Sequence, residues 1–145
     1  MDAAIFLLRL LIGGLLLLAG ALKVGHAPEL ASAIAGFRLL PASIVGPLAL
    51  GLPFIEILLG FYIAAGLFTR VAASVACVQF VGYAGAVGSA VLRHIPADCG
   101  CFGPADSAVA DWPHVGLDLL LALVCAFIAY EAPGALAVDR RLHTT

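Results

Sequence analysis

Two cysteines separated by one glycine are the residues of this chain best suited to chemistry, in the run Asp98-Cys99-Gly100-Cys101-Phe102-Gly103-Pro104. A disulfide needs its two Cα atoms within about 4.4–6.8 Å of each other, and an extended pair two residues apart lies near the upper limit. The chain must therefore turn back at Gly100, where no Cβ opposes the turn. So small a ring stabilises a fold by only about 1.6 kcal/mol before strain is subtracted. Because strained, exposed disulfides are easily reduced, we predict that Cys99 and Cys101 are a redox-active, catalytic pair.

Ordinary free thiols and metal ligands are the alternatives for this pair. His94 and His114 flank the loop, and with Asp98 and the two cysteines they supply the ligand types of a soft metal site. Histidines at helix ends are more often only polar ends, so we assign no metal ligand. Protonated histidine or Arg93 would lower the pKa of a nearby thiol, whereas Asp98 would raise it. We predict supporting roles for Arg93, His94, Asp98 and His114. Phe102 is a fifth supporting residue, because we expect its ring to hold the loop against the membrane surface.

The composition is that of a membrane protein. Of 145 residues, 63% are apolar and 11% are charged, and the mean hydropathy is +1.14. A soluble domain has about half apolar residues and about a quarter charged ones. The formal net charge of −2 provides no basic surface for a nucleic acid. We predict a single domain, residues 1–145, embedded in a lipid bilayer. Cys77 and Cys125 lie inside apolar runs, where buried cysteines usually act as small hydrophobic residues.

Four apolar runs are long enough to cross a bilayer as helices. Between the first two runs, an amphipathic stretch at about 28–39 is predicted to form a helix on the membrane surface. The expected fold class is therefore all-α, an integral membrane four-helix up-down bundle with one short interfacial amphipathic helix. In the third run, Gly82, Ala86 and Ala90, with Gly85 and Ser89, predict close helix contacts, because small residues let two backbones approach. The predicted spans are approximately residues 3–22, 47–67, 70–92 and 114–131.

Glu56, Arg9 and Lys23 are charged residues within or next to the first two spans. Glu56 lies near the bilayer middle, and an intramembrane carboxylate is a functional candidate by default. We expect Glu56 to point into the bundle, with Arg9 and Lys23 as the candidate partners nearest in depth. The Arg9 side chain either extends to the nearer membrane surface or pairs within the bundle. Pro53, just before Glu56, predicts a kink in the second span.

The charge distribution predicts the orientation of the chain in the membrane. Four spans place both termini on one side, and the side richer in Lys and Arg faces the cytoplasm. We therefore expect cytoplasmic termini and a multi-pass protein of the bacterial inner membrane. The Cys99–Cys101 loop then faces the outside, where disulfides persist. The side with the termini carries Arg9, Arg70, Arg140 and Arg141, and the other side carries Lys23, Arg38 and Arg93.

Five short segments match a known pattern, and the resemblance that they carry extends over nearly the whole chain. They are Arg9 with Ala19-Gly20-Ala21-Leu22-Lys23, Leu39-Leu40-Pro41, Leu52-Pro53-Phe54-Ile55-Glu56, Gly66-Leu67-Phe68-Thr69-Arg70 and Cys99-Gly100-Cys101-Phe102-Gly103. On these segments the sequence resembles the MauE/DoxX family of small four-helix membrane proteins, and most closely its MauE-like branch. The helix segments are loose patterns, and the Cys-Gly-Cys-Phe-Gly run is the specific one.

The resemblance implies a role in redox processes outside the cytoplasmic membrane. In this family, MauE looks like a protein that works with a thioredoxin-like partner to mature a disulfide-rich enzyme subunit. The expected function is thiol–disulfide exchange between a periplasmic thioredoxin-like partner and a membrane acceptor such as a quinone. The outline is also similar to quinone-linked bundles such as vitamin K epoxide reductase, which use a C-x-x-C pair instead. A metal-binding or metal-passing membrane protein, and a non-catalytic scaffold for a redox partner, are the alternative functions.

Overall fold

The computed structural model describes residues 2–98 and 109–132. These residues form helices α1 (Asp2–Lys23), α2 (Ala27–Gly36), α3 (Ala42–Ala65), α4 (Thr69–Leu92) and α5 (Trp112–Glu131). In these two ranges the only β-type pairing is an isolated antiparallel bridge between Asp98 and Val109. Helices α1, α3, α4 and α5 are each long and apolar enough to cross a membrane. The prediction of an all-α membrane fold is confirmed, and the chain is a multi-pass membrane protein.

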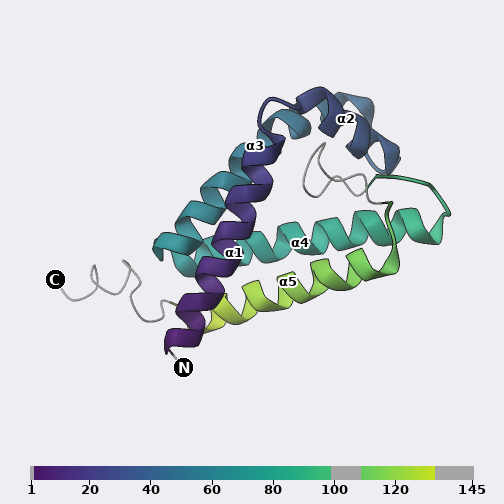
Figure 1. Cartoon of the computed structure of the whole chain (residues 1–145). Coiled ribbons are helices and arrows are strands. Elements are labelled where there is room, and N and C mark those ends of the chain that lie inside the picture. The colour runs from purple at the N-terminus through teal and green to yellow at the C-terminus, as the bar shows by residue number, and fades with distance from the viewer. Residues whose placement is uncertain (1, 99–108, 133–145) are drawn as a thin grey trace.

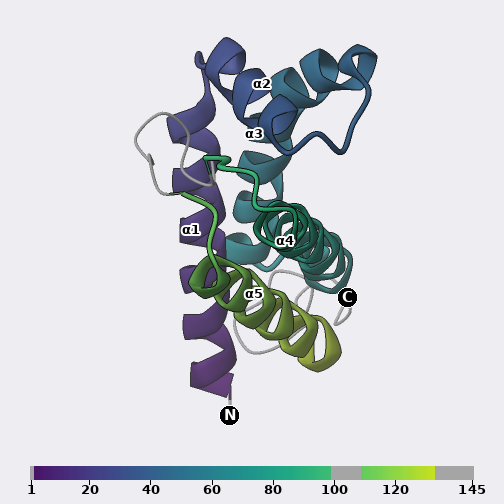
Figure 2. The same cartoon turned by 90° about the vertical axis from the view of Figure 1, so that its right-hand side faces the viewer.

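The largest shift from the predicted bounds is in α3, which begins at Ala42 rather than near residue 47. Its N-cap is Pro41, which has an extended backbone, so Pro47 and Pro53 both lie inside the helix. A proline inside a helix removes one backbone hydrogen bond and bends the axis. Figure 2 shows that the first turns of α3 run at an angle to the rest of the helix. The surface helix α2 ends at Gly36, earlier than predicted, and Arg38 beyond it adopts a φ of 52°.

The four long helices form two pairs that cross as a wedge. Helix α1 packs along α3, and α4 packs along α5. The pairs meet at the end of the molecule that holds the start of α1 and the end of α5, and they diverge toward the other end (Figures 1 and 2). Helix α2 lies across the open end and packs on α3. The bundle therefore has a narrow end and a wide end.

The main hydrophobic core fills the narrow end and draws on all four long helices. Cys125 is buried in this core, Cys77 packs against it, and both are free thiols. Apolar side chains from both helix pairs pack together in this cluster. Its buried members are Ile12, Leu16, Leu59, Ile63, Ala72, Ala73, Ala76, Phe80, Ala122, Cys125 and Ile128.

Glycines bring α1 and α3 into close contact. A Cβ added to Gly13 would lie 2.7 Å from the carbonyl oxygen of Gly60, and one added to Gly20 would lie 2.6 Å from that of Pro53. The prediction of close contacts on α4 is wrong at Gly82 and Gly85, because a Cβ added to either would have no neighbour within 4 Å. The tight contact of this fold is in the first helix pair instead.

Two arginines satisfy helix ends at the narrow end. Arg9 is fully buried, with 0% of its surface exposed. Its Nε donates to the carbonyl of Ile63 at 3.0 Å and its Nη2 to that of Ala64 at 3.3 Å, the last turn of α3. Arg70 likewise donates to the carbonyl of Ala129 at 3.3 Å. Since the last carbonyls of a helix have no partner within it, Arg9 pairs within the bundle, through backbone groups.

The wide end is held by a second, smaller core. Its buried residues are Phe37, Val87, Ala90 and Ala97. The backbone N–H of Ala110 donates to the carbonyl of Ala97 at 2.9 Å, so the two segments that flank the 99–108 loop are joined at its base. This base thus packs on the ends of α2 and α4.

Candidate functional site

A buried ion pair lies where the two helix pairs diverge. Lys23 comes from the last turn of α1 and Glu56 from α3, and each side chain is only 1% exposed. The Lys23 Nζ lies 2.7 Å from Glu56 Oε1 and 2.8 Å from Oε2. The expectation that Glu56 points into the bundle and meets a basic residue is confirmed, with Lys23 as the partner.

Two polar side chains of α4 complete this network. The Tyr83 hydroxyl donates to Glu56 Oε1 at 2.6 Å. Gln79 Nε2 donates to the same oxygen at 3.1 Å and to the Tyr83 hydroxyl at 3.0 Å. Sequence reasoning missed both residues, although they stand four positions apart in an apolar span and therefore on one helix face. The network links both helix pairs, because α1 and α3 supply the ions and α4 supplies the neutral donors.

Among the described residues, the hydrogen bonds of the network leave one N–H of Lys23 without an acceptor. The Glu56 carboxylate accepts four hydrogen bonds, two from Lys23 and one each from Gln79 and Tyr83. A lysine ammonium has three N–H donors, and in the part of the chain described here two of them are used. The Lys23 ammonium also lies 5.6 Å from the centre of the Tyr83 ring, a distance that allows a cation–π attraction. The network is neutral overall and keeps one N–H available.

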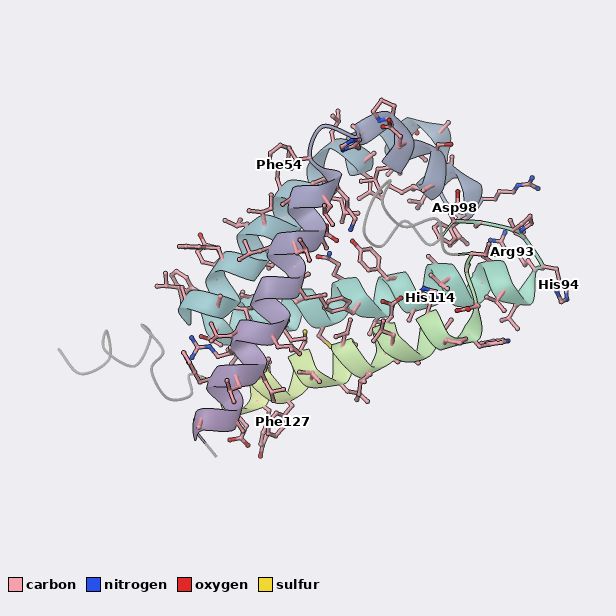
Figure 3. All side chains as sticks on the ribbon, in the orientation of Figure 1. Phe54, Arg93, His94, Asp98, His114 and Phe127 are labelled. Atoms are coloured by element: carbon pink, nitrogen blue, oxygen red, sulfur yellow. The ribbon has the colours of Figure 1, made fainter. Side chains whose placement is uncertain are left out.

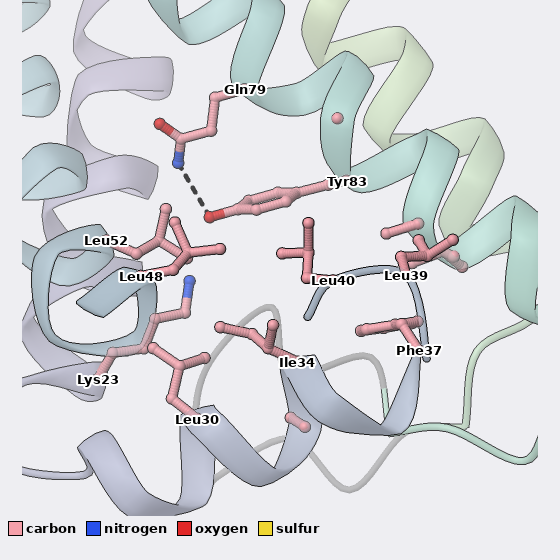
Figure 4. Close-up of a pocket in the computed structure, with 14 residues that line it drawn as sticks. Lys23, Leu30, Ile34, Phe37, Leu39, Leu40, Leu48, Leu52, Gln79 and Tyr83 are labelled. Atoms are coloured by element: carbon pink, nitrogen blue, oxygen red, sulfur yellow. Dashed lines mark hydrogen bonds between the residues drawn. The ribbon is translucent and has the colours of Figure 1, made fainter. Parts of the chain in front are cut away.

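This network borders an apolar cavity of about 320 Å³ in the wedge. Figure 4 shows Lys23, Gln79 and Tyr83 on one side and a wall of leucines, Ile34 and Phe37 around the rest. The Lys23 side chain extends inward, with its nitrogen toward the cavity. Small-molecule sites are typically apolar cavities of about 300–1,000 Å³ with a few placed polar groups. The wall comprises Leu30, Ile34, Phe37, Leu39, Leu40, Leu48 and Leu52, with Ala33, Gly82, Ala86 and Val87.

The base of the 99–108 loop packs against the wall of this cavity. Phe37 and Val87 line the cavity and also belong to the second core, which contains Ala97. Arg93 strengthens this region, because its guanidinium donates to the carbonyls of Phe37 and Ser89. Phe37 and Val87 therefore belong both to the cavity wall and to the core that contains Ala97, just before the cysteine loop.

The predicted catalytic residues Cys99 and Cys101, and Phe102 with them, lie outside the described residues. Their predicted roles stay predictions. Asp98, the last described residue before them, is exposed and pairs by backbone with Val109.

The two histidines of the metal hypothesis are not gathered around a common point. His94 is exposed beyond the end of α4, and Figure 3 shows it well apart from His114. The His114 ring lies 2.5 Å from Asp111 Oδ1, and Asp111 also accepts from the His114 backbone N–H at 3.1 Å. Hydrogen bonding from His114 lowers the pKa of Asp111 below its usual value. Over residues 2–98 and 109–132, no three His, Cys, Asp or Glu side chains form a group suited to a metal ion.

A comparison with models of protein families identifies the family of this chain. Residues 1–131 match the family described as methylamine utilisation protein MauE. The chain belongs to the MauE family. Neither a search of curated proteins nor a search of solved structures found a similar protein. Membership associates this multi-pass membrane protein with a methylamine utilisation-related system.

The matched range includes every part of the site in this MauE-family chain. It contains the network of Lys23, Glu56, Gln79 and Tyr83 as well as the C-x-C run. It also contains Asp118, a mostly buried residue of α5 whose Oδ2 has no hydrogen-bond partner among the described residues. Such an atom in an apolar helix usually marks either a cost in stability or a functional group.

Proposed function

We propose that this MauE-family chain is a thiol–disulfide redox protein of the bacterial inner membrane. It exchanges electrons between a periplasmic thioredoxin-like protein and a membrane acceptor, a quinone, through Cys99 and Cys101. The observation that supports this best is the contact between the base of the cysteine loop and the wall of an apolar cavity. A loop that starts from this base suits a redox pair that must meet both a protein partner and a membrane-dissolved acceptor.

In the proposed exchange, the thioredoxin-like partner supplies the electrons and protons and the quinone accepts them. A thiolate of the reduced partner attacks Cys99 of the Cys99–Cys101 disulfide, and the Cys101 thiolate leaves. The second thiolate of the partner attacks the mixed disulfide, so the partner leaves oxidised and both cysteines of the chain are thiols. Their reoxidation to a disulfide transfers two electrons and two protons to the quinone, which becomes a hydroquinone. The opposite direction follows the same steps in reverse.

Two alternatives compete with this proposal. A metal-binding or metal-passing protein would need the cysteines and at least one more ligand, for which His94 and His114 are the histidines nearest in sequence. A scaffold that only holds a redox partner needs no reactive cysteine at all. A change in the number of free thiols between oxidised and reduced protein would support the redox function, and bound metal would support the metal-binding one.

The test uses purified protein in detergent with reduced thioredoxin as the dithiol and a short-chain ubiquinone as the acceptor. Oxidation of thioredoxin is followed together with the ultraviolet absorbance of the quinone. We expect Cys99→Ser and Cys101→Ser each to reduce the rate to the uncatalysed background. Cys77→Ser is the matched control, because Cys77 packs on the core of the narrow end, and it should keep wild-type activity.

The outcomes discriminate between the functions. Full activity in both single variants would exclude the cysteine mechanism and favour the scaffold. Stoichiometric zinc or copper that is lost in the two variants, without thiol oxidation in the wild type, would favour the metal-binding function.

A further inference from the structure

We infer that the cavity bordered by Lys23, Gln79 and Tyr83 is a binding site for the ring of a lipid-soluble quinone, one carbonyl of which accepts the remaining N–H of Lys23. This inference rests on the proposed function for the role of the quinone, but the site is argued from its own geometry. The cavity has the volume of a small-molecule site, about 320 Å³. Its wall is apolar apart from these three residues.

The polar side of the cavity specifies a neutral ligand with a hydrogen-bond acceptor. Lys23 carries the positive charge, and Glu56 neutralises it at 2.7 and 2.8 Å. Both N–H groups of Gln79 and the O–H of Tyr83 are already donated within the network. Among the described residues one N–H of Lys23 has no acceptor, which suits a carbonyl oxygen. A carboxylate or phosphate would bring a negative charge that nothing in the described network balances.

The wall specifies a flat and apolar ligand. The ring of Tyr83 forms part of it and is presented with leucines, Ile34 and Phe37 around the same space (Figure 4). Aromatic rings favour offset or edge contacts with other planar rings. A quinone ring combines this shape with carbonyl groups, whereas an acyl chain has the apolar surface without either.

The rim of the cavity provides a route from the bilayer. Leu39 and Leu40 line the cavity and are 49% and 41% exposed. Gly82 of α4 lines it from the opposite helix pair and is also exposed. A ligand dissolved in lipid therefore reaches the cavity past apolar side chains. Within the cavity it contacts Phe37 and Val87, which also pack at the base of the cysteine loop.

Two glycines of α4 provide a matched test of this site. Gly82 lines the cavity and Gly85 does not. Both are exposed, and a Cβ added to either would have no atom within 4 Å. Leucine at either position is therefore expected to leave the fold intact, while only Gly82→Leu places a side chain in the cavity. Thermal unfolding in detergent checks that the two variants are equally stable.

Binding of a short-chain ubiquinone is measured by isothermal titration calorimetry on the oxidised full chain. We expect Gly82→Leu to weaken binding by about ten-fold or more and Gly85→Leu to bind like the wild type, because blocking a well-packed contact costs one or more factors of ten. An alkylbenzene with the same tail but no carbonyls should bind the wild type about ten-fold more weakly than the quinone, since it cannot accept a hydrogen bond from a charged donor.

Each result bears on the site separately from the thiol chemistry. Equal quinone affinity of Gly82→Leu and Gly85→Leu would overturn the site, as would equal affinity of the wild type for the quinone and the alkylbenzene. Competition by a fatty acid or phospholipid at the affinity of the quinone would overturn the choice of ligand. A single-turnover reaction of Gly82→Leu with reduced thioredoxin, without quinone, reports the proposed thiol exchange alone. Failure of that exchange in the wild type, with quinone binding retained, would remove the proposed function and leave the site.

Discussion

The Glu56 carboxylate is costly to bury, and hydrogen-bond donors from three residues stabilise it. Its carboxylate is 1% exposed and accepts hydrogen bonds from Lys23, Gln79 and Tyr83. A buried ion pair contributes little net stability compared with apolar residues of the same shape, but removing one partner leaves an uncompensated charge. This asymmetry makes the pair testable. Because the pair adds little net stability, stability alone does not account for its presence.

The first prediction concerns this pair. Lys23→Met should lower the free energy of unfolding by about 3–5 kcal/mol, because it leaves the Glu56 carboxylate buried without its cation. The double variant Lys23→Met/Glu56→Leu should recover most of that loss. Thermal and denaturant unfolding of the purified protein in one detergent measures both effects. Losses that simply add in the double variant would show that the two residues are not coupled.

Sequence reasoning found half of this network for a definite reason. Charged residues in apolar spans are conspicuous, so Glu56 and Lys23 were identified, and depth along the helices limited the partner to two residues. Gln79 and Tyr83 are polar but neutral, and a span tolerates such residues on several faces. Only the packing of α4 across the other pair shows that their face meets Glu56.

At the scale of elements, glycine patterns predicted close packing but not its location. Small residues recur in α1, α3 and α4, and the α4 pattern was the more regular one in the sequence. The structure uses Gly13, Gly20 and Gly60 for the close contact of α1 with α3, whereas Gly82 borders the cavity. A small-residue face is equally compatible with a tight helix contact and with an open space. Sequence periodicity alone does not distinguish the two.

The second prediction compares neighbouring glycines of α1. Gly13→Ala places a Cβ 2.7 Å from a backbone oxygen of α3 and 2.8 Å from the Ala64 Cβ. We expect it to destabilise the fold by about 1–3 kcal/mol, as overpacking of a tight contact does. Gly14→Ala has no neighbour within 4 Å and should be neutral or slightly stabilising, since alanine favours helix over glycine. Unfolding midpoints measured side by side provide the comparison, and equal destabilisation by both variants would contradict the contact.

At the scale of the whole molecule, the number of spans was predictable and the wedge was not. Four apolar runs of spanning length follow from counting, and the structure has four such helices. The divergence of the two helix pairs depends on which faces pack, on the bend of α3 and on α2 across the open end. The cavity is a consequence of that divergence. It joins residues of α1, α2, α3 and α4 that lie far apart in the sequence.

The last prediction concerns the orientation of the wedge in the membrane. The start of α1 and the end of α5 lie at the narrow end, and α2 and the base of the cysteine loop lie at the wide end. Four arginines belong to the side of the termini, Arg9, Arg70, Arg140 and Arg141, against Lys23, Arg38 and Arg93 on the other. Lys23 and Arg9 are both buried, and leaving both out keeps the excess of positive charge on the side predicted to hold the termini. The side richer in Lys and Arg stays in the cytoplasm.

Reporter fusions measure this orientation directly. Green fluorescent protein fused after Thr145 should fluoresce and alkaline phosphatase at the same position should be inactive, whereas alkaline phosphatase fused after Arg38 should be active. Arg140→Gln/Arg141→Gln leaves Arg9 and Arg70 against Lys23, Arg38 and Arg93, which reverses the bias. Part of the population should therefore take the opposite orientation, because the orientation follows the Lys and Arg bias. Active alkaline phosphatase after Thr145 in the wild type would reverse the orientation. The cysteine loop would then face the cytoplasm, where disulfides rarely persist, and the periplasmic partner would lose its access to Cys99.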